Sequence, residues 1–357
     1  MSRPIHRHCA IVLALLTTTS CEFSLDVAAA WQISYPRVLG VRMEVVEPAP
    51  IWLERLGFDP DDAPIAEALP GDRVRLVPLV VDAEGRQQPP EAIDALWFQC
   101  GEYSDRSECT VAVPRCDLVK WTTEIPCEIG RGLLEFPFPA VGPASLESGS
   151  MRVLGIIGRE PEVDAERCRA GLLAGTDELS GCSVVVADVS VGPRWALYID
   201  AIEAGAELDV NPYEIPYAAL QQRANRTPAP EPAVLLDADT GIPLEGSPPR
   251  VHPGQRVKTS GPSWRTYDRQ AYMTGEPAQG VSEFYFFEIH LEQFGVRYFA
   301  SGPIMFTKID GPRLEFVVDE YAHAGIARLI VAVVDRRKYD AGQSTVGISV
   351  QEIEVVP

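Results

Sequence analysis

The sequence lacks the motifs by which most enzyme classes are recognised. It contains no phosphate-binding P-loop, no G-x-G-x-x-G dinucleotide motif after a strand and no H-E-x-x-H zinc motif. Residues 342–346 come near a serine-hydrolase elbow, but Val346 stands where G-x-S-x-G needs its second glycine. There are five histidines, and His6 and His8 lie near the N-terminus. We therefore predict a protein with no catalytic role and no cofactor.

Positive charge and long apolar stretches are also scarce. Lys and Arg total 31 against 51 Asp and Glu, so the net charge is −20 at pH 7. This balance opposes binding to nucleic acid and to anionic headgroups, because both require Lys and Arg to neutralise phosphates. Beyond residue 20, no stretch approaches the roughly 18 apolar residues that a membrane helix needs. We expect no nucleic-acid partner.

The first twenty residues have the pattern of an export signal. Arg3 and Arg7 give a basic start, residues 10–16 are apolar, and small residues lead up to Cys21. A cysteine directly after such a segment resembles the lipobox of bacterial lipoproteins. The resemblance implies that residues 1–20 are removed and that the Cys21 thiol receives a diacylglycerol.

Two details bear on this interpretation. The position three residues before the cysteine is Thr18, where the lipobox usually has leucine. An A-x-A cleavage site at residues 28–30 would instead release a soluble secreted protein. The lipoprotein reading predicts a tether over residues 21–34. It also predicts a cell-envelope location, in the outer membrane of a Gram-negative bacterium, with membrane contact through the lipid.

Six cysteines remain after Cys21. An even number in an exported chain predicts three disulfides. The alternative is a metal cluster, but there is no C-x-x-C pair, and the first four cysteines are too widely spaced for a zinc knuckle. Cys168 and Cys182 flank a glycine-containing loop and are expected to pair, whereas the pairing of the other four stays open. The six candidates are Cys100, Cys109, Cys116, Cys127, Cys168 and Cys182.

The chain contains an internal repeat. Residues 70–75, Pro-Gly-Asp-Arg-Val-Arg, recur as Pro-Gly-Gln-Arg-Val-Lys at 253–258. Similar segments follow each copy in the same order, which predicts two copies of one fold. These later matches are 96–98 with 284–287, 134–136 with 314–316, 152–157 with 328–333, and 183–191 with 345–356.

The local pattern predicts an all-β fold. Short runs rich in Val, Ile, Phe and Tyr alternate with Pro, Gly and Asp, without a sustained 3.6-residue period. The Pro-Gly turn, the aromatic strand with Trp97 and the late apolar strand resemble immunoglobulin-like modules of bacterial surface lipoproteins. In such a module residues 36–44 would form the opening strand. The resemblance implies two immunoglobulin-like β-sandwich domains in tandem, although the Cys-Trp-Cys arrangement of true immunoglobulin domains is absent.

The repeat also suggests domain boundaries. We expect one domain over residues 35–200, with disulfide-bearing insertions, and a second over 231–357. Residues 201–230 would link them. Residues 211–226 are the one plausible helix, with a cap at Asn211, and the proline-rich stretch at 227–232 predicts a semi-rigid linker.

Two groups of side chains are candidate metal ligands. Glu288, His290 and Glu292 would share one face of a strand at steps of about 6.6 Å, and His323 from a neighbouring strand could join them. The simpler reading, which we favour, is the wet face of a sandwich strand. The acidic loops at 59–62 and 237–241 could bind calcium, but they lack the EF-hand spacing, and solvated loops are the simpler reading.

A third candidate site is aromatic. Trp264, Tyr267 and Tyr272 could stack on a sugar ring or a partner protein, although core packing is the more common role for such residues. The favoured function is binding or scaffolding at the membrane or cell surface, with an envelope protein or a glycan as partner. The alternative is an envelope enzyme or a carbohydrate-binding module whose site is built from loops.

Overall fold

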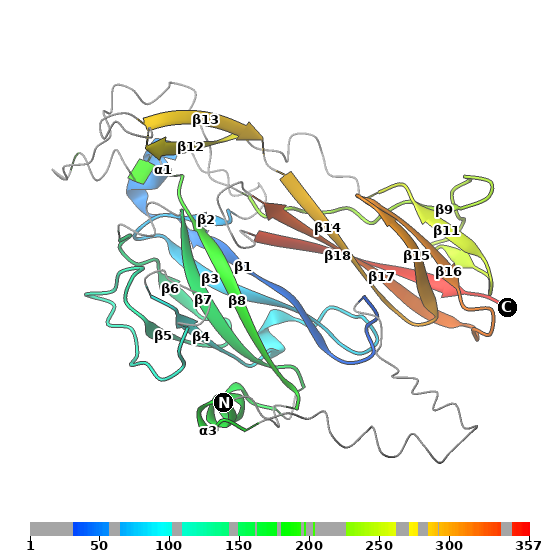
Figure 1. The fold of residues 1–357 in the computed structure, drawn as a ribbon, viewed down its shortest axis with the longest axis horizontal. Helices are drawn as coiled ribbons and strands as arrows, with labels where there is room; N and C mark the ends of the chain where they lie inside the picture. Colours follow the sequence, from blue (N-terminus) through cyan, green and yellow to red (C-terminus); the bar gives the residue numbers. More distant parts are fainter. Residues whose placement is uncertain are drawn as a thin grey trace, which may run out of the picture. The chain divides into compact units, whose positions relative to one another are not determined.

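The polypeptide folds mainly into antiparallel β-strands, which supports the predicted all-β class (Figure 1). The computed structural model describes residues 31–56, 65–101, 109–142, 149–160, 163–176, 180–193, 196–197, 203, 226–261, 271–277, 285–291, 293–336 and 345–357. The predicted signal peptide and Cys21 lie outside these residues. Within them, no helix is long and apolar enough to cross a membrane.

The strands of the first half form two sheets. The smaller sheet has the order β1 (Arg37–Glu47), β3 (Arg73–Val81) and β6 (Glu135–Pro137). The larger has the order β2 (Glu67–Ala68), β8 (Cys182–Val191), β7 (Ser150–Gly158), β4 (Ala95–Gln99) and β5 (Cys127–Arg131). All neighbours are antiparallel except β2 and β8.

The second half repeats this arrangement. One sheet has the order β15 (Ile304–Asp310), β16 (Arg313–Val318), β11 (Arg256–Thr259) and β9 (Leu235–Asp237). The other has the order β10 (Arg250–Val251), β18 (Thr345–Val355), β17 (Gly325–Arg336) and β14 (Gln293–Ser301), with β10 parallel to β18. A separate hairpin pairs β12 (Ala271–Pro277) with β13 (Tyr285–Leu291).

Each half has a core that draws on both of its sheets. In the first half, Met43 and Leu76 from one sheet belong to the same buried cluster as Trp97 and Ile157 from the other. In the second half, Phe316 of one sheet and Leu329 of the other likewise belong to a single buried cluster. Such cores, formed between the faces of two sheets, are those of sandwich-like pairs.

A third buried cluster joins residues of the two halves. Val77 and Leu79 of β3 belong to it, together with Phe299 of β14 and Ile330 of β17. The alternate residues of β3 and β17 face the sandwich cores, so both strands are buried on both faces. This explains why both sequences are nearly continuous apolar runs.

The repeat seen in the sequence is reproduced in the strand register. Val74 of β3 lies opposite Phe136 of β6. Val257 of β11 lies opposite Phe316 of β16. Both Pro-Gly turns are also bonded to the end of that partner strand. The Gly71 N–H donates to the Phe138 carbonyl group just after β6, and the Gly254 N–H donates to the Val318 carbonyl group at the end of β16.

One match in the repeat was wrong. Residues 284–287 were expected to correspond to the aromatic strand 96–98, which is part of β4 and pairs with β7. The strand that pairs with β17 in the same way is β14, whereas β13 pairs with β12. Tyr298 of β14 therefore takes the place of Trp97. The Tyr298 hydroxyl donates to the Pro312 carbonyl group, and the Trp97 indole N–H donates to the Gly132 carbonyl group at the corresponding position.

The helices also differ from expectation. The structure contains α1 (Pro50–Leu56), a 3₁₀ turn η2 (Pro90–Ala92) and α3 (Ala165–Ala174), so residues 211–226 are not the one helix. Residues 211–225 lie outside the described part of the chain. Asp164 caps α3 by accepting from the Arg167 N–H, and Gly175 ends it at a φ of 65°.

Part of the predicted linker over 227–232 is buried against the rest of the protein. Thr227, Pro228 and Pro230 are buried, and the Pro228 carbonyl lies against Gly347 of β18. The role of residues 201–230 as a linker stays a prediction.

A candidate binding loop

Three disulfides are closed, as the cysteine count predicted. Cys168 pairs with Cys182, which was the expected local pair. The four cysteines whose pairing was open form Cys100–Cys109 and Cys116–Cys127. Both of these bridges lie in the long insertion between β4 and β5, and the second closes the segment that we call the braced loop, residues 116–127.

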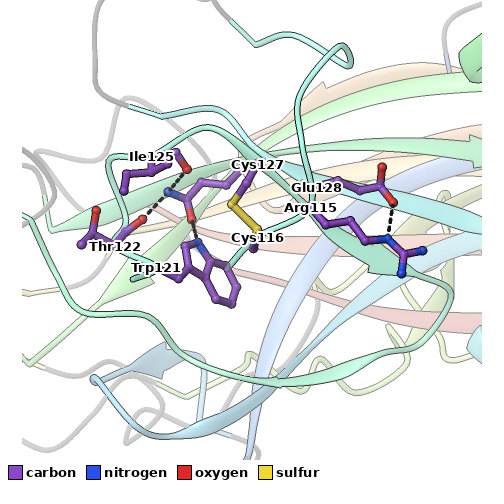
Figure 2. Close-up of a disulfide and its surroundings, with 8 residues drawn as sticks. Arg115, Cys116, Trp121, Thr122, Ile125, Cys127 and Glu128 are labelled. Carbon is purple, nitrogen blue, oxygen red and sulfur yellow. Dashed lines mark hydrogen bonds and ion pairs between the residues drawn. A yellow bond between two sulfur atoms is a disulfide. The ribbon is translucent and has the colours of Figure 1, made fainter. Parts of the chain in front are cut away.

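A buried glutamine holds the inside of the braced loop (Figure 2). Gln99, at the end of β4, is fully buried. Its Nε2 donates to the carbonyl groups of Thr122 at 2.7 Å and Ile125 at 3.0 Å, and its Oε1 accepts from the Trp121 indole at 2.6 Å. Every hydrogen-bonding atom of this amide has a partner, as a buried polar group requires.

Trp121 ties the braced loop to the core of the first half. Its side chain is 5% exposed and belongs to that core, where its ring centroid lies 5.5 Å from that of Phe136. Backbone bonds between Thr123 and Ala140, and between Ala140 and Trp121, add a short strand-like contact. The braced loop is therefore held at its disulfide-closed base and along residues 121–123.

A buried carboxylate ties the base of the braced loop to α3. Glu128 follows Cys127 and its side chain is 8% exposed. Arg169 of α3 approaches it at 2.8 Å and also donates to the carbonyl group of Val111, while Arg115 lies at 3.5 Å. Figure 2 shows Arg115 and Glu128 on the other side of the disulfide from Trp121.

The tip of the braced loop is apolar and exposed. Val119 is 91% exposed and Leu118 is 62% exposed. The tip has a defined turn, because Asp117 accepts from the Val119 N–H through its side chain and from the Lys120 N–H through its carbonyl group. Lys120, Arg115 and Asp117 are exposed beside it, and Arg115 pairs with Glu128. The local surface therefore combines two aliphatic side chains with two cations and one carboxylate.

The helix α3 covers the outer face of the larger sheet in the first half. Phe98, Leu154 and Ile156 of that face belong to one buried cluster with Ala165 and Cys168 of the helix. The Cys168–Cys182 bridge fastens α3 to the start of β8. The segment between β7 and β8 thus covers this face of the sheet through α3, and it also supplies the Arg169 that supports the braced loop.

The predicted metal ligands lie in different parts of the chain, and the structure does not describe all of them. His290 and Glu288 lie on β13, where their backbones pair with Tyr272 and Thr274 of β12. Glu292 lies outside the described residues, and His323 is exposed. Among the side chains that the structure describes, no group of three or more His, Cys, Asp or Glu could hold a metal ion. The proposed Glu288–His290–Glu292 site stays a prediction.

The two acidic loops were candidate calcium sites. Residues 59–62 lie outside the described part of the chain. Asp237 is engaged within its own loop, since its Oδ1 accepts from the backbone N–H groups of Asp239 and Thr240 and from the Thr240 hydroxyl. Hydrogen bonds from Thr240 and Gln255 lower the pKa of Asp237 to about 2. The carboxylate therefore works as a turn-forming group.

The aromatic candidates fall largely outside the described residues. Trp264 and Tyr267 are not described, and Tyr272 lies on β12. The sequence did not indicate the braced loop through aromatic residues or carboxylates, which are the usual signs of a binding site. The available signal was a pair of aliphatic residues, Leu118 and Val119, placed shortly after Cys116 in the segment that ends at Cys127.

Comparisons with known proteins assign the chain to no family. No family model matches it, and no curated protein matches it. Among solved structures, dimeric latent PorU from Porphyromonas gingivalis is 12% identical with a TM-score of 0.19. That match covers 90% of this chain and 24% of the PorU chain, so this chain spans about a quarter of it. A likeness this low carries no argument about fold or function.

Proposed function

We propose that this protein is a non-catalytic lipoprotein of the bacterial cell envelope that binds a partner protein through the braced loop. The lipid would sit on Cys21. The two halves would be immunoglobulin-like modules that carry the loop at the cell surface or membrane.

The strand order supports the immunoglobulin-like part of this proposal. In a constant-type immunoglobulin domain, one sheet has the order A-B-E-D and the other holds C, F and G. The second half matches this with β9-β11-β16-β15 in one sheet and β14, β17 and β18 in the other. The first half differs in that β5 pairs with β4 instead of joining β6.

Export and anchoring are supported by the cysteines. Three closed disulfides favour an oxidising compartment over the cytosol. The basic, apolar and small residues before Cys21 favour lipid attachment at that position.

The observation that carries the binding role is the comparison between the two halves at the braced loop. After β14 the second half continues into β15 through Gly302 and Pro303 alone. At the corresponding place, the first half inserts residues 100–126. Since the second sandwich forms with a two-residue turn, an insertion of this length is not a requirement of the fold type, although Trp121 packs in the core of the first half. Two disulfides and the buried amide of Gln99 hold the exposed apolar tip of this insertion in place.

The charge of the chain favours a protein partner over a membrane for this loop. Pre-organised apolar anchors gain affinity because little conformational freedom is lost on binding. Leu118 and Val119 offer too little apolar area to insert a body of net charge −20 into an anionic bilayer. Arg115 and Lys120 beside the tip fit a partner with an apolar pocket bordered by carboxylates.

The test uses a photoreactive amino acid at position 119 in the full-length protein in its own cells. Ile242, an aliphatic residue of the second half that is 63% exposed, is the control position. We expect one discrete protein adduct from position 119 and none from 242. Binding of the purified adduct partner should then weaken by about tenfold or more in Val119→Asp, and stay unchanged in Ile242→Asp. Equal adducts from both positions, or unchanged binding in Val119→Asp, would contradict the proposal.

A further inference from the structure

The described chain begins with a short strap that is fixed to the second half. We use the name N-terminal strap for residues 31–33. Trp31 stacks on Phe306 of β15, with ring centroids 4.3 Å apart and an angle of 22° between the rings. The Ala300 N–H donates to the Trp31 carbonyl group at 3.0 Å, and the Ile33 N–H donates to the Ala300 carbonyl group at 2.8 Å. Ile33 is 3% exposed.

The position of the strap limits where a lipid on Cys21 can be. Ten residue steps separate Cys21 from Trp31, and a fully extended chain of that length spans at most about 35 Å. The acyl chains must therefore enter the bilayer within that distance of Trp31, and hence of β14 and β15.

The surface next to the strap has one exposed aliphatic and one exposed aromatic side chain. The turn between β14 and β15 is bonded to the segment after β16, because the Asp319 N–H donates to the Pro303 carbonyl group at 2.9 Å. Gly302 of this turn lies against Ala327 of β17. We use the name turn surface for Met305 of β15, which is 45% exposed, and Tyr321 after β16, which is 80% exposed. Glu320 and His323, on either side of Tyr321 in the chain, are exposed as well.

The turn surface has the composition of a membrane-interface contact. Trp and Tyr are enriched at the level of lipid headgroups, where the ring is partly in apolar surroundings and its polar end in water. Tyr321 is held in place, since its N–H donates to the Asp319 carboxylate at 2.9 Å. Asp319 and Glu320 precede it, so the contact suits zwitterionic headgroups better than anionic ones.

We propose that the turn surface is the part of the protein that faces and touches the bilayer. This inference rests on the proposed lipid on Cys21. It adds an orientation, because the membrane side of the molecule would be the turn between β14 and β15. The braced loop is a separate surface, so its partner can be tested independently.

The experiment uses the full-length lipidated protein in phosphatidylcholine vesicles that contain a lipid with a nitroxide headgroup. A fluorophore is attached at Tyr321→Cys, at Met305→Cys, or at the control Ile242→Cys. Ile242 follows β9, at the opposite edge of the sheet from β15. We expect quenching at 321 and 305 to exceed quenching at 242 by about twofold or more, because Tyr321 would lie at the level of the headgroups and Ile242 would not.

The outcomes separate the inference from the proposed function. The mass of the N-terminal peptide is measured first. A peptide without lipid on Cys21 would overturn both the anchor and the orientation. A lipidated protein with equal quenching at all three positions would overturn the orientation alone. Two labelled positions on the turn surface keep the test decisive if one variant fails to fold.

Discussion

At the scale of single residues, the two Pro-Gly turns show how a repeat keeps its geometry while its chemistry changes. Asp72 accepts from the Leu69 N–H, three residues earlier, and also from the Ala49 N–H. Gln255 at the corresponding position accepts from the His252 N–H, again three residues earlier. Asp72 is 3% exposed. Burial raises its pKa to about 6 from 3.8, although the two backbone bonds act in the opposite direction.

This carboxylate predicts a pH dependence of folding. Because its pKa is raised in the folded state, folded Asp72 holds its proton more tightly than unfolded Asp72 between about pH 4 and 6. Its contribution to stability is therefore lost as the pH rises through that window. A shift from 3.8 to about 6 corresponds to about 3 kcal/mol.

The measurement compares the free energy of unfolding of wild type and Asp72→Asn from pH 4 to pH 8. The difference, wild type minus variant, should fall by up to about 3 kcal/mol as the pH rises. Glu91→Gln, which removes an exposed carboxylate, is the control. A difference that is constant with pH would show that Asp72 does not titrate in the folded state as argued.

At the scale of elements, α3 shows how an insertion becomes part of the fold. The helix is short and would be marginal alone. It is held by its Asp164 cap, by the bridge from Cys168 to Cys182, and by Arg169 on Glu128. The Asp94 carboxylate also accepts from the Ala165 N–H at 2.7 Å. Several weak constraints together keep the outer face of the larger sheet covered.

The cap offers a matched pair of variants. Asp164→Ala removes the oxygen that accepts from the Arg167 N–H at 2.6 Å, and should lower the free energy of unfolding by about 1 kcal/mol. Asp164→Asn keeps a capping oxygen and should change it by a few tenths at most. Denaturant titrations of both variants check this. Equal losses in the two would indicate that charge, and not the capping bond, holds the helix start.

At the scale of the whole molecule, the buried cluster that joins the two halves, called here the shared cluster, decides whether the halves unfold together. Leu79 of β3 and Ile330 of β17 belong to this cluster and are fully buried, although they lie in different halves. The Ser301 hydroxyl and the Arg328 guanidinium both donate to the Glu84 carbonyl group across the same boundary. Two sandwiches joined in this way should unfold together.

Truncation of either residue should destabilise the same transition. Leu79→Ala and Ile330→Ala should each lower the free energy of unfolding by about 3 kcal/mol. Val184→Ala, on an exposed face of β8 at 45% exposure, should cost less than about 1 kcal/mol. Calorimetry of the three variants makes the comparison. Two separable transitions, only one of which moves in Leu79→Ala, would contradict coupling through the shared cluster.

Much of the fold could be predicted from local pattern, and the site could not. Strand character followed from β-branched runs, and the closed disulfides from an even cysteine count after the predicted export signal. The match of 284–287 to β4 failed because an aromatic run indicates a strand without indicating its partner. The helix α3 was read as a loop because Gly171 and Gly175 suggested turns, although Asp164 and Gly175 are a usable pair of end signals.

The sequence alone determined the all-β class, the repeated Pro-Gly turns and the oxidation of the six cysteines, because these depend on neighbours in the chain and on the cellular compartment. Only the tertiary structure decided that β3 and β17 are buried on both faces, that β14 corresponds to β4, and that Leu118 and Val119 stand exposed on a braced loop. Those facts depend on contacts between distant residues. A run of apolar residues looks the same in the sequence whether one face of the strand is buried or both faces are.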